Sequence, residues 1–311
     1  MAKNCLVTGG AGFIGSHLSD KLIELGHNVT IIDNLSATNS SQYVNKDAFF
    51  VNCDILDTIT EHIIEYKKID TIFHLAAIPR VQQSIKEPEL THKVNVEGTF
   101  NLLSLAKKYN VERFIFASSS AVYGNANSDF SEWVQPDPIS PYGLHKLMGE
   151  QYCQLYSKLY NLKTICLRIF NAYGPRQNPN GGYACVIPKF ISLLKAHKNC
   201  EIFGDGKNSR DYIYVSDIVN AFVAAGFSEN IFNSTMPAKG IINVGSGKSF
   251  SLNTITEKLK KLLNVEIDNK YLPAVIEPQT TIANIWKMSK LLGEPKIYFD
   301  EGLKSIIEAL K

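Results

Sequence analysis

The stretch NCLVTGGAGFIGS, residues 4–16, decides the fold. Residues 4–8 form an apolar run that is typical of a buried parallel strand. Glycines at positions 9, 12 and 15 follow it, and an amphipathic helix is predicted from Ser16 to Leu25, where Gly26 ends it. A second strand pattern over residues 28–32 ends in Asp33. This order of strand, glycine turn, helix and strand predicts an α/β protein with a Rossmann-type, doubly wound parallel sheet.

Each part of this motif has a use in binding a dinucleotide. The first glycine permits a tight turn, the second lets a pyrophosphate approach the backbone, and the third lets helix and strand pack closely. The helix N-terminus offers free N–H groups to the phosphates. A carboxylate after the second strand accepts from both ribose hydroxyls and repels a 2′-phosphate, which favours NAD over NADP. The cofactor residues predicted here are Gly9, Gly12, Phe13, Ile14, Gly15, Asp33 and Asn34.

The alternation of strands and helices continues, with strand patterns over residues 49–53, 71–75 and 113–117 and a long helix pattern over 91–109. Ligands of such sheets bind at the carboxyl ends of the strands. An acidic side chain there can accept a hydrogen bond from the adenine amino group, while an apolar neighbour packs on the adenine ring. Alternatively, the acidic residue caps the next helix. A run of three serines there is either a polar turn or part of the crevice. The further cofactor residues expected are Asp54, Ile55, Leu75, Ala76, Ala77, Asn95 and Ser118.

Tyr142 and Lys146 lie four residues apart on a helix predicted to run from Pro141 to about Tyr160, so they share one face. A unit charge ~4 Å from a phenol is worth about 4 kcal/mol at intermediate dielectric, which would lower the pKa of the phenol. A tyrosine and a lysine at this spacing can therefore provide a base near neutral pH. In isolation the same spacing is usually an ordinary surface pair.

The second half of the chain begins with a strand over 163–170 that ends at Asn171. A loop rich in glycine, proline and asparagine occupies 173–185, and loops of this length are often functional. Further helices are predicted over 186–195, 216–226 and 252–263, and strands over 211–215 and 241–245. We expect an NAD-binding domain over 1–172, to which 211–245 returns in part, and a smaller α/β substrate domain over 173–311.

Composition excludes several classes of protein. The net charge is +2 and no long run of either sign occurs, which argues against nucleic acid or a membrane surface as partner. The six cysteines are scattered without metal-like spacing, so no metal is expected. The first strand pattern starts at residue 4, and no apolar run reaches the length of a membrane span. A cytoplasmic protein is expected.

The motifs in combination resemble the extended short-chain dehydrogenase/reductase family over nearly the whole chain. They are the glycine turn, Asp33, Asp54-Ile55, Ser118-Ser119-Ser120, the Tyr142/Lys146 pair, Asn171 and Tyr173-Gly174-Pro175-Arg176. Within that family the sequence is similar to nucleotide-sugar 4-epimerases. Residues 176–189 most resemble bacterial epimerases of UDP-N-acetylhexosamines.

The resemblance implies a mechanism. Tyr142, held as phenolate by Lys146, would take the proton of the sugar 4-hydroxyl while the hydride at C4 passes to NAD. Ser119 would hydrogen-bond the 4-oxygen, with Ser118 and Ser120 as alternatives, and Lys146 would also bind the nicotinamide ribose. The 4-keto sugar would turn over and take the hydride back on its other face, so NAD is regenerated.

The positions after Ser119 separate reaction types within the family. Related dehydratases and decarboxylases carry acids there, whereas this chain has Ser120 and Ala121. The resemblance therefore implies epimerisation without elimination. A dehydrogenase that releases NADH, a UDP-glucuronate 4-epimerase and a non-catalytic NAD-sensing protein are the alternatives.

The second domain would hold the UDP-sugar. Its predicted contacts, together with those of the catalytic crevice, are Ser119, Ser120, Tyr142, Asn171, Ala184, Val186, Lys189, Phe203, Arg210 and Thr281. Arg210 would pair with the diphosphate. A second arginine, which many relatives carry near residues 274–284, is absent here. Thr281 stands where N-acetyl-tolerant relatives have a small residue, so UDP-GlcNAc and UDP-GalNAc are the expected substrates, with UDP-Glc and UDP-Gal as further ones. Helices near 92–108 and 142–160 would form a homodimer interface.

Overall fold

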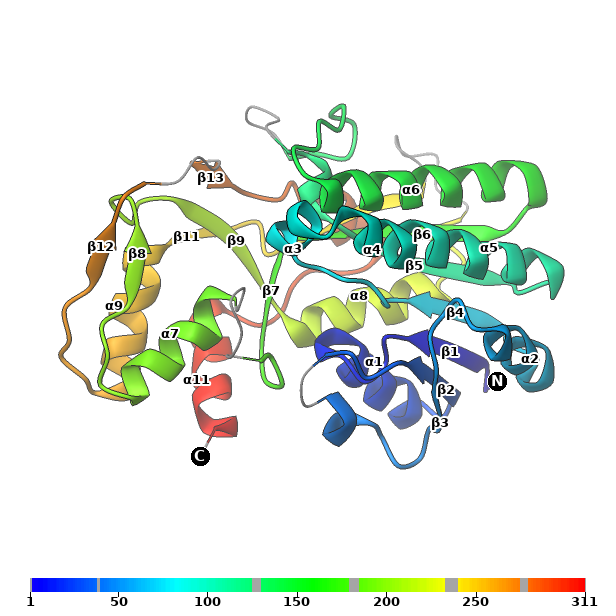
Figure 1. The fold of residues 1–311 in the computed structure, drawn as a ribbon, viewed down its shortest axis with the longest axis horizontal. Helices are drawn as coiled ribbons and strands as arrows, with labels where there is room; N and C mark the ends of the chain where they lie inside the picture. The colour runs from blue at the N-terminus through cyan, green and yellow to red at the C-terminus, as the bar shows by residue number, and fades with distance from the viewer. Residues whose placement is uncertain are drawn as a thin grey trace.

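The computed structural model describes residues 2–37, 40–124, 130–178, 185–232, 240–274 and 279–310. Within these residues the chain forms two parts (Figure 1). A large sheet lies between two layers of helices, and a smaller group of strands and helices extends from one end of it.

The large sheet has seven strands, all paired in parallel. In spatial order they are β10 (Ile241–Val244), β6 (Lys163–Ile169), β5 (Arg113–Ser119), β4 (Thr71–His74), β1 (Asn4–Thr8), β2 (Asn28–Asp33) and β3 (Phe49–Asn52). The order reverses between β1 and β4, which is the point where such sheets bind ligands. The predicted Rossmann-type α/β fold is confirmed.

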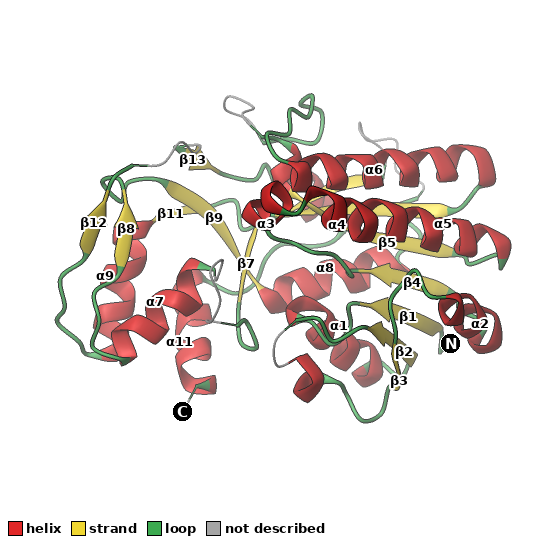
Figure 2. Cartoon of the chain, viewed as in Figure 1, coloured by secondary structure: helices red, strands yellow, loops and turns green. Residues whose placement is uncertain are grey.

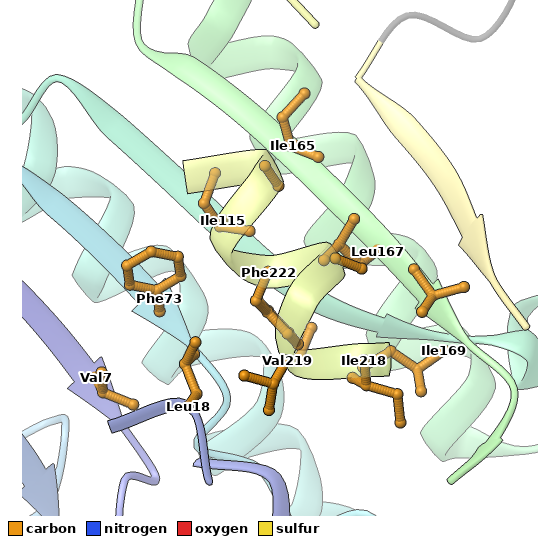
Figure 3. Packing of buried hydrophobic residues seen from close by; sticks show 14 of the residues in the cluster. Val7, Leu18, Phe73, Ile115, Ile165, Leu167, Ile169, Ile218, Val219 and Phe222 are labelled. Carbon is orange, nitrogen blue, oxygen red and sulfur yellow. The ribbon is translucent and has the colours of Figure 1, made fainter. Parts of the chain in front are cut away.

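Helices cover both faces of this sheet (Figure 2). On one face lie α1 (Phe13–Glu24) and α8 (Val215–Phe227), and on the other lie α2 (Thr58–Lys67), α5 (Gly98–Lys108) and α6 (Pro141–Tyr160). In Figure 3 Phe222 of α8 packs with Ile115 and Leu167 of adjacent strands. Each fully buried side chain of this size contributes roughly 1.5–3 kcal/mol, so these layers fix the positions of the strand ends.

The helix predicted over 91–109 is present and contains a π turn. The structure has α4 (Pro88–His92), a π turn over Lys93–Glu97, and then α5. Asn95 lies in the π turn, where its side-chain amide binds both the N–H and the C=O of Ile78, at 2.8 and 3.1 Å. Single π turns often occur at functional sites. Helix α1 also begins three residues earlier than predicted, and helix α3 (Val81–Lys86) was not predicted.

The smaller part contains short strands that the sequence patterns did not predict. Its elements are β7 (Asn171–Tyr173), α7 (Val186–Lys195), β8 (Glu201–Phe203), β9 (Ser209–Tyr214), β11 (Ser249–Ser251), α9 (Leu252–Leu263), β12 (Lys270–Leu272), β13 (Thr280–Thr281) and α11 (Phe299–Ala309). Helix α10 (Trp286–Leu291) instead packs against β10 of the large sheet. Elsewhere in the described residues, single 3-10 turns occur over Ser40–Tyr43 and Ser120–Val122. The predicted strand over 211–215 starts two residues earlier, so Arg210 lies inside β9.

Residues from the second half of the chain join the large sheet. Strand β10 pairs with β6, and α8 packs against α1. The buried carboxylate of Asp211 in β9 ties the two parts together, because it accepts from the N–H groups of Ser246, Gly247 and Ala283 at 2.7, 2.9 and 3.0 Å. The division of the chain into domains at residue 172 remains a prediction.

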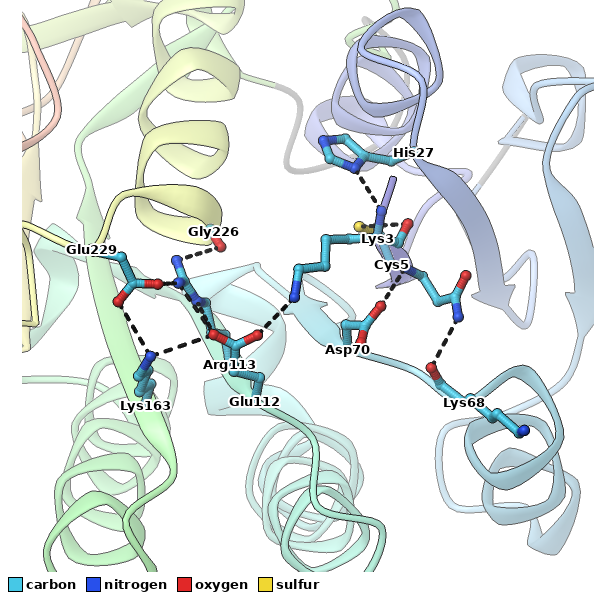
Figure 4. A network of polar contacts seen from close by, with 11 residues as sticks. Lys3, Cys5, His27, Lys68, Asp70, Glu112, Arg113, Lys163, Gly226 and Glu229 are labelled. Carbon is cyan, nitrogen blue, oxygen red and sulfur yellow. Dashed lines mark hydrogen bonds and ion pairs between the residues drawn. The ribbon is translucent and has the colours of Figure 1, made fainter. Parts of the chain in front are cut away.

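The amino ends of the strands are joined by a polar network (Figure 4). The buried guanidinium of Arg113 donates to the C=O of Gly226 at 2.9 Å and also pairs with Glu229. Lys163 at the start of β6 bridges Glu112 and Glu229 at 3.4 and 3.2 Å. This network holds the C-terminal end of α8 at the amino ends of the strands, away from their carboxyl ends.

A second buried ion pair lies between α6 and β6. The guanidinium of Arg168 donates to both carboxylate oxygens of Glu150, at 2.9 and 2.7 Å, and both side chains are almost completely buried. The hydroxyl of Ser118 donates to the same carboxylate at 2.5 Å. Because it is bidentate and enclosed, this pair positions α6 against β5 and β6.

Replacing Arg168 with Met should therefore leave the buried carboxylate of Glu150 uncompensated. We expect a loss of about 3–5 kcal/mol in the free energy of unfolding, measured by urea denaturation. The double variant Glu150→Leu with Arg168→Met should recover much of the loss, because no buried charge remains. A single variant as stable as the parent protein would contradict this account.

Candidate active site

The glycine turn is confined by its surroundings. Gly9 has φ +69°, and a Cβ there would lie 2.7 Å from the N of Ala76. A Cβ at Gly15 would overlap the C=O of Gly9. Gly12 is the N-cap residue of α1 and makes no side-chain cap, so the first N–H groups of the helix face the turn. The turn therefore forms a cradle that only glycines allow, closed on one side by the segment after β4.

The carboxyl ends of β2 and β3 lie beside this cradle. Asp33 accepts from the N–H groups of Ala11 and Leu35 at 3.0 and 2.8 Å, which fixes the carboxylate against the turn. Burial raises the pKa of Asp33, and these two hydrogen bonds oppose the effect. Asn34 donates to the carboxylate of Asp54 at 3.0 Å, so the two strand ends are joined.

Several other predicted cofactor residues already make contacts within the protein. Ile55 is buried beside Gly98 of α5, where a Cβ would overlap its side chain. Ala76 donates its N–H to the Thr8 hydroxyl at 3.3 Å, and Leu75 and Ala77 are half-buried on either side of it. Asn95 uses its amide to hold Ile78, so it positions the segment after β4 rather than offering free polar groups.

These features fit a dinucleotide. The cradle and the uncapped N-terminus of α1 match the pyrophosphate. The carboxylate of Asp33 matches the ribose hydroxyls. NAD would be held by the glycine turn and Asp33, with the nicotinamide end toward the carboxyl ends of β4 and β5.

Tyr142 lies at the start of α6, which packs against β5. Ser140 caps the helix by accepting from the N–H of Gly143 at 3.1 Å, and Pro141 occupies the first helical position. The N–H of Tyr142 donates to the hydroxyl of Ser84 in α3 at 3.0 Å. The side chain of Tyr142 is only 8 % exposed, so its phenol lies in a largely water-free setting.

The three serines at the carboxyl end of β5, Ser118 to Ser120, have different surroundings. The hydroxyl of Ser118 is buried and donates to Glu150, so it faces away from the phenol. Ser119 is half-buried and hydrogen-bonds the Tyr142 phenol, and its oxygen also accepts from the N–H of Ala121 at 3.1 Å. Ser120 begins a 3-10 turn. Of the three, Ser119 is thus the hydroxyl that the fold brings to Tyr142.

Lys146 is buried one turn further along α6. Its Nζ donates to the C=O of Ala117 at 2.8 Å and lies 5.9 Å from the centre of the Tyr142 ring. Burial lowers the pKa of Lys146 to about 8. The nearby His74 is fully buried between Thr8 and Thr99, and burial lowers its pKa to about 3.

The electrostatics of the phenol differ from the sequence expectation. Burial raises the pKa of Tyr142, while the hydrogen bond from Ser119 and the charge of Arg80 lower it. Lys146 was expected to supply such a charge; its Nζ donates to the carbonyl of Ala117 and lies 5.9 Å from the centre of the Tyr142 ring, and its role remains a prediction. Arg80 was not among the predicted site residues. Its position shortly after a strand that ends at the crevice was the signal that could have found it.

The predicted UDP-sugar contacts are spread over the smaller part. Arg210 and Thr281 are paired across β9 and β13, and the Thr281 hydroxyl is buried without a hydrogen-bond partner among the described residues. Asn171 donates to the C=O of Asp211 at 3.0 Å. Val186 and Lys189 lie half-buried on the first turn of α7, and Phe203 on β8 is 45 % exposed. Ala184 lies outside the described residues.

Among the described residues, no group of three or more histidine, cysteine, aspartate or glutamate side chains could hold a metal ion. In the same part of the chain, the helices are all too short or too polar to cross a membrane.

The chain is similar to solved structures of epimerases over almost its whole length. It is 37 % identical to the UDP-glucose 4-epimerase of Thermotoga maritima, solved with UDP-glucose, with a TM-score of 0.92 and coverage of 99 % of this chain and 98 % of that one. The same identity, TM-score and coverage relate it to the UDP-N-acetylglucosamine 4-epimerase of Methanobrevibacter ruminantium M1, solved with UDP-N-acetylmuramic acid.

A third structure is the UDP-glucuronic acid 4-epimerase of Bacillus cereus, solved with UDP-glucuronic acid and NAD. It is 33 % identical, with a TM-score of 0.87 and coverage of 99 % and 98 %. Residues 5–245 match the family described as "NAD dependent epimerase/dehydratase family", and this span contains the glycine cradle, Ser119, Tyr142 and Lys146. The chain therefore belongs to the NAD-dependent epimerase/dehydratase family of enzymes, and its cofactor is NAD.

Proposed function

We propose that this enzyme is a 4-epimerase of UDP-N-acetylhexosamines that also accepts UDP-glucose and UDP-galactose. The observation that carries the proposal is the hydrogen-bonded pair of Ser119, at the carboxyl end of β5, and the buried phenol of Tyr142. The next positions, Ser120 and Ala121, provide no acid for an elimination. Proton transfer without loss of water or carbon dioxide is the chemistry that such a site supports.

Each residue of the site would have a separate role in catalysis. Bound NAD supplies reversible hydride exchange with the sugar carbon. Tyr142 takes the proton of the 4-hydroxyl and returns it, while Ser119 holds the 4-oxygen and steadies the phenol. Lys146 binds the ribose hydroxyls next to the nicotinamide. The buried surroundings exclude water, which strengthens these interactions and keeps the keto sugar from side reactions.

The smaller part would hold the nucleotide. Arg210 would pair with the diphosphate, for which a planar guanidinium is well suited. Val186 and Lys189 would line the uridine pocket, with Phe203 on the base and Asn171 near the sugar. Thr281 is the neighbour of Arg210 across the strand ladder, and its hydroxyl has no hydrogen-bond partner among the described residues, so it could bind a polar group of the substrate.

Replacing Tyr142 with Phe should abolish turnover and leave NAD bound, because only the proton-transferring oxygen is lost. We expect a fall of at least about 10²-fold in kcat, the usual range for a general base. Turnover is followed by chromatography of the UDP-sugars, and bound NAD by mass spectrometry of released ligands. Tyr66→Phe, which changes a tyrosine that is 77 % exposed on α2, is the matched control. Unchanged turnover in Tyr142→Phe would refute the assigned base.

The substrate assignment is tested with a panel of UDP-GlcNAc, UDP-GalNAc, UDP-Glc, UDP-Gal and UDP-glucuronate. We expect interconversion of the N-acetylated pair and of the hexose pair. Thr281→Tyr should lose the N-acetylated pair about 10²-fold more than the hexoses, because the larger ring fills the space for the acetamido group. Thr281→Ser is the matched control. Absence of turnover with every N-acetylated sugar would overturn the assignment.

We also propose that the enzyme is a homodimer through α5 and α6, which lie side by side in Figure 1. Large apolar side chains on these helices are exposed, namely Phe100, Leu144, Leu155, Leu159 and Tyr160. Several exposed apolar side chains on two neighbouring helices are typical of an interaction surface.

Leu155→Lys should shift the dimer to monomer, because a charge at the centre of an apolar interface is costly to bury. Light scattering during gel filtration measures the mass. Ile59→Lys, at a comparably exposed position on α2, should leave the mass unchanged. A monomeric parent protein would rule the interface out.

A further inference from the structure

Residues 75–78, which follow β4, lie directly against the glycine turn. A Cβ at Gly9 would come within 2.7 Å of the N of Ala76. The side-chain amide of Asn95 holds the far end of this segment through two backbone hydrogen bonds, at 2.8 and 3.1 Å. Nearer to β4, the N–H of Ala76 donates to the hydroxyl of Thr8 at 3.3 Å. The segment that closes the cradle is therefore fixed at two points.

His74, the last residue of β4, connects these two points. Its Nδ1 lies 2.8 Å from the hydroxyl oxygen of Thr8, and its Nε2 lies 2.9 Å from the hydroxyl oxygen of Thr99. The Thr99 hydroxyl in turn donates to the C=O of Asn95 at 2.7 Å. The imidazole is almost completely buried, and two phenylalanine rings pack against it. One chain of hydrogen bonds thus joins Ala76 to Asn95, the two residues through which the segment is fixed.

The direction of each hydrogen bond in this chain follows from the hydrogens that are available. A threonine hydroxyl has one hydrogen to donate. The hydroxyl of Thr99 donates its hydrogen to a carbonyl oxygen, so the Nε2 of His74 carries a hydrogen and donates it to Thr99. At the other end, Thr8 accepts from the N–H of Ala76 and has its own hydrogen left for Nδ1. A neutral imidazole with a hydrogen on Nε2 and none on Nδ1 satisfies every group of the chain.

The surroundings of His74 disfavour its other protonation states. In the part of the chain that the structure describes, the two ring nitrogens bind hydroxyl groups and no carboxylate. Burial, and to a smaller extent the positive charge of Lys146, lower the pKa of His74 to about 3. A hydrogen on Nδ1 would also deprive the hydroxyl hydrogen of Thr8 of this acceptor. One tautomer is therefore fixed at neutral pH.

We propose that His74 is a positioning residue for the cofactor, whose fixed tautomer holds residues 75–78 against the glycine turn and so shapes one wall of the NAD site. Because the ring is buried, it acts on NAD through Thr8 and Ala76. A wall that is already ordered binds more tightly than one that must be ordered when the ligand arrives. The inference depends on NAD as the cofactor and not on which sugar the enzyme converts.

The tautomer can be measured directly and without any turnover. In protein that carries isotope-labelled histidine, NMR correlations between the carbon-bound ring protons and the ring nitrogens show which nitrogen is protonated. The signals of His74 are assigned by their loss in His74→Asn. We expect a protonated Nε2 and a bare Nδ1 from about pH 5 to about pH 8, the range in which an unperturbed histidine changes its charge. A hydrogen on Nδ1 in this range would overturn the proposal.

Two replacements of His74 separate its hydrogen bonds from its packing. His74→Phe fills the volume of the ring but removes the acceptor of the Thr8 hydroxyl, so the dissociation constant of NAD should rise about tenfold. His74→Asn packs less well, but its side-chain oxygen lies close to the place of Nδ1, so the dissociation constant should stay within about threefold of the parent value. Equilibrium dialysis measures NAD binding, and urea denaturation measures stability. If the ring only fills space, His74→Asn will bind NAD more weakly than His74→Phe, and the proposal fails.

Thr8→Val tests the same contact from its other side, and it serves as well if the histidine variants do not fold. It keeps the shape of the side chain and removes the acceptor of the Ala76 N–H, so it should also weaken NAD binding about tenfold. Thr164→Val is the matched control, because it removes a buried hydroxyl that donates to the C=O of Cys153 near the amino end of β6. It should leave NAD binding unchanged. Parental affinity for NAD in either His74→Phe or Thr8→Val would overturn the proposal.

Discussion

The close approach of backbone at Gly9 is the constraint on which the site depends. With no Cβ at this position, the segment after β4 packs directly against the turn after β1. The missing Cβ of Gly15 lets α1 start immediately above the same turn. These contacts place the N-terminus of α1 and the carboxyl ends of β1 and β4 around one space. The pyrophosphate site and the catalytic crevice are neighbours for this reason.

Buried polar groups then fix the catalytic side chains. Glu150 holds Arg168 and the hydroxyl of Ser118, which leaves Ser119 as the serine that faces Tyr142. Such pairs contribute little net stability, but breaking one is costly, so they favour a single arrangement of α6 and β5. At the junction with the smaller part, the carboxylate of Asp211 has the same effect on the segments that would hold the nucleotide.

Much of the fold was predictable because its signals are local. The glycine spacing, the apolar strand runs and the Ser140-Pro141 start of α6 each follow from backbone sterics or capping within a few residues. The short strands of the smaller part have two to six residues and depend on partners far along the chain, so no local pattern predicts them. The π turn at Asn95 has no local signal that the sequence analysis used, and the residue that the Asn95 side chain binds, Ile78, comes from another segment.

The sequence by itself determined the fold class, the dinucleotide turn and the pairing of Tyr142 with Lys146 on one helix face. It also determined that no acid follows Ser119. Only the tertiary structure decided which serine meets the phenol. Ser118 and Ser119 are neighbours in sequence, but the hydroxyl of Ser118 donates to Glu150 whereas Ser119 faces Tyr142. The reason is physical: packing rather than sequence order sets the distances between side chains.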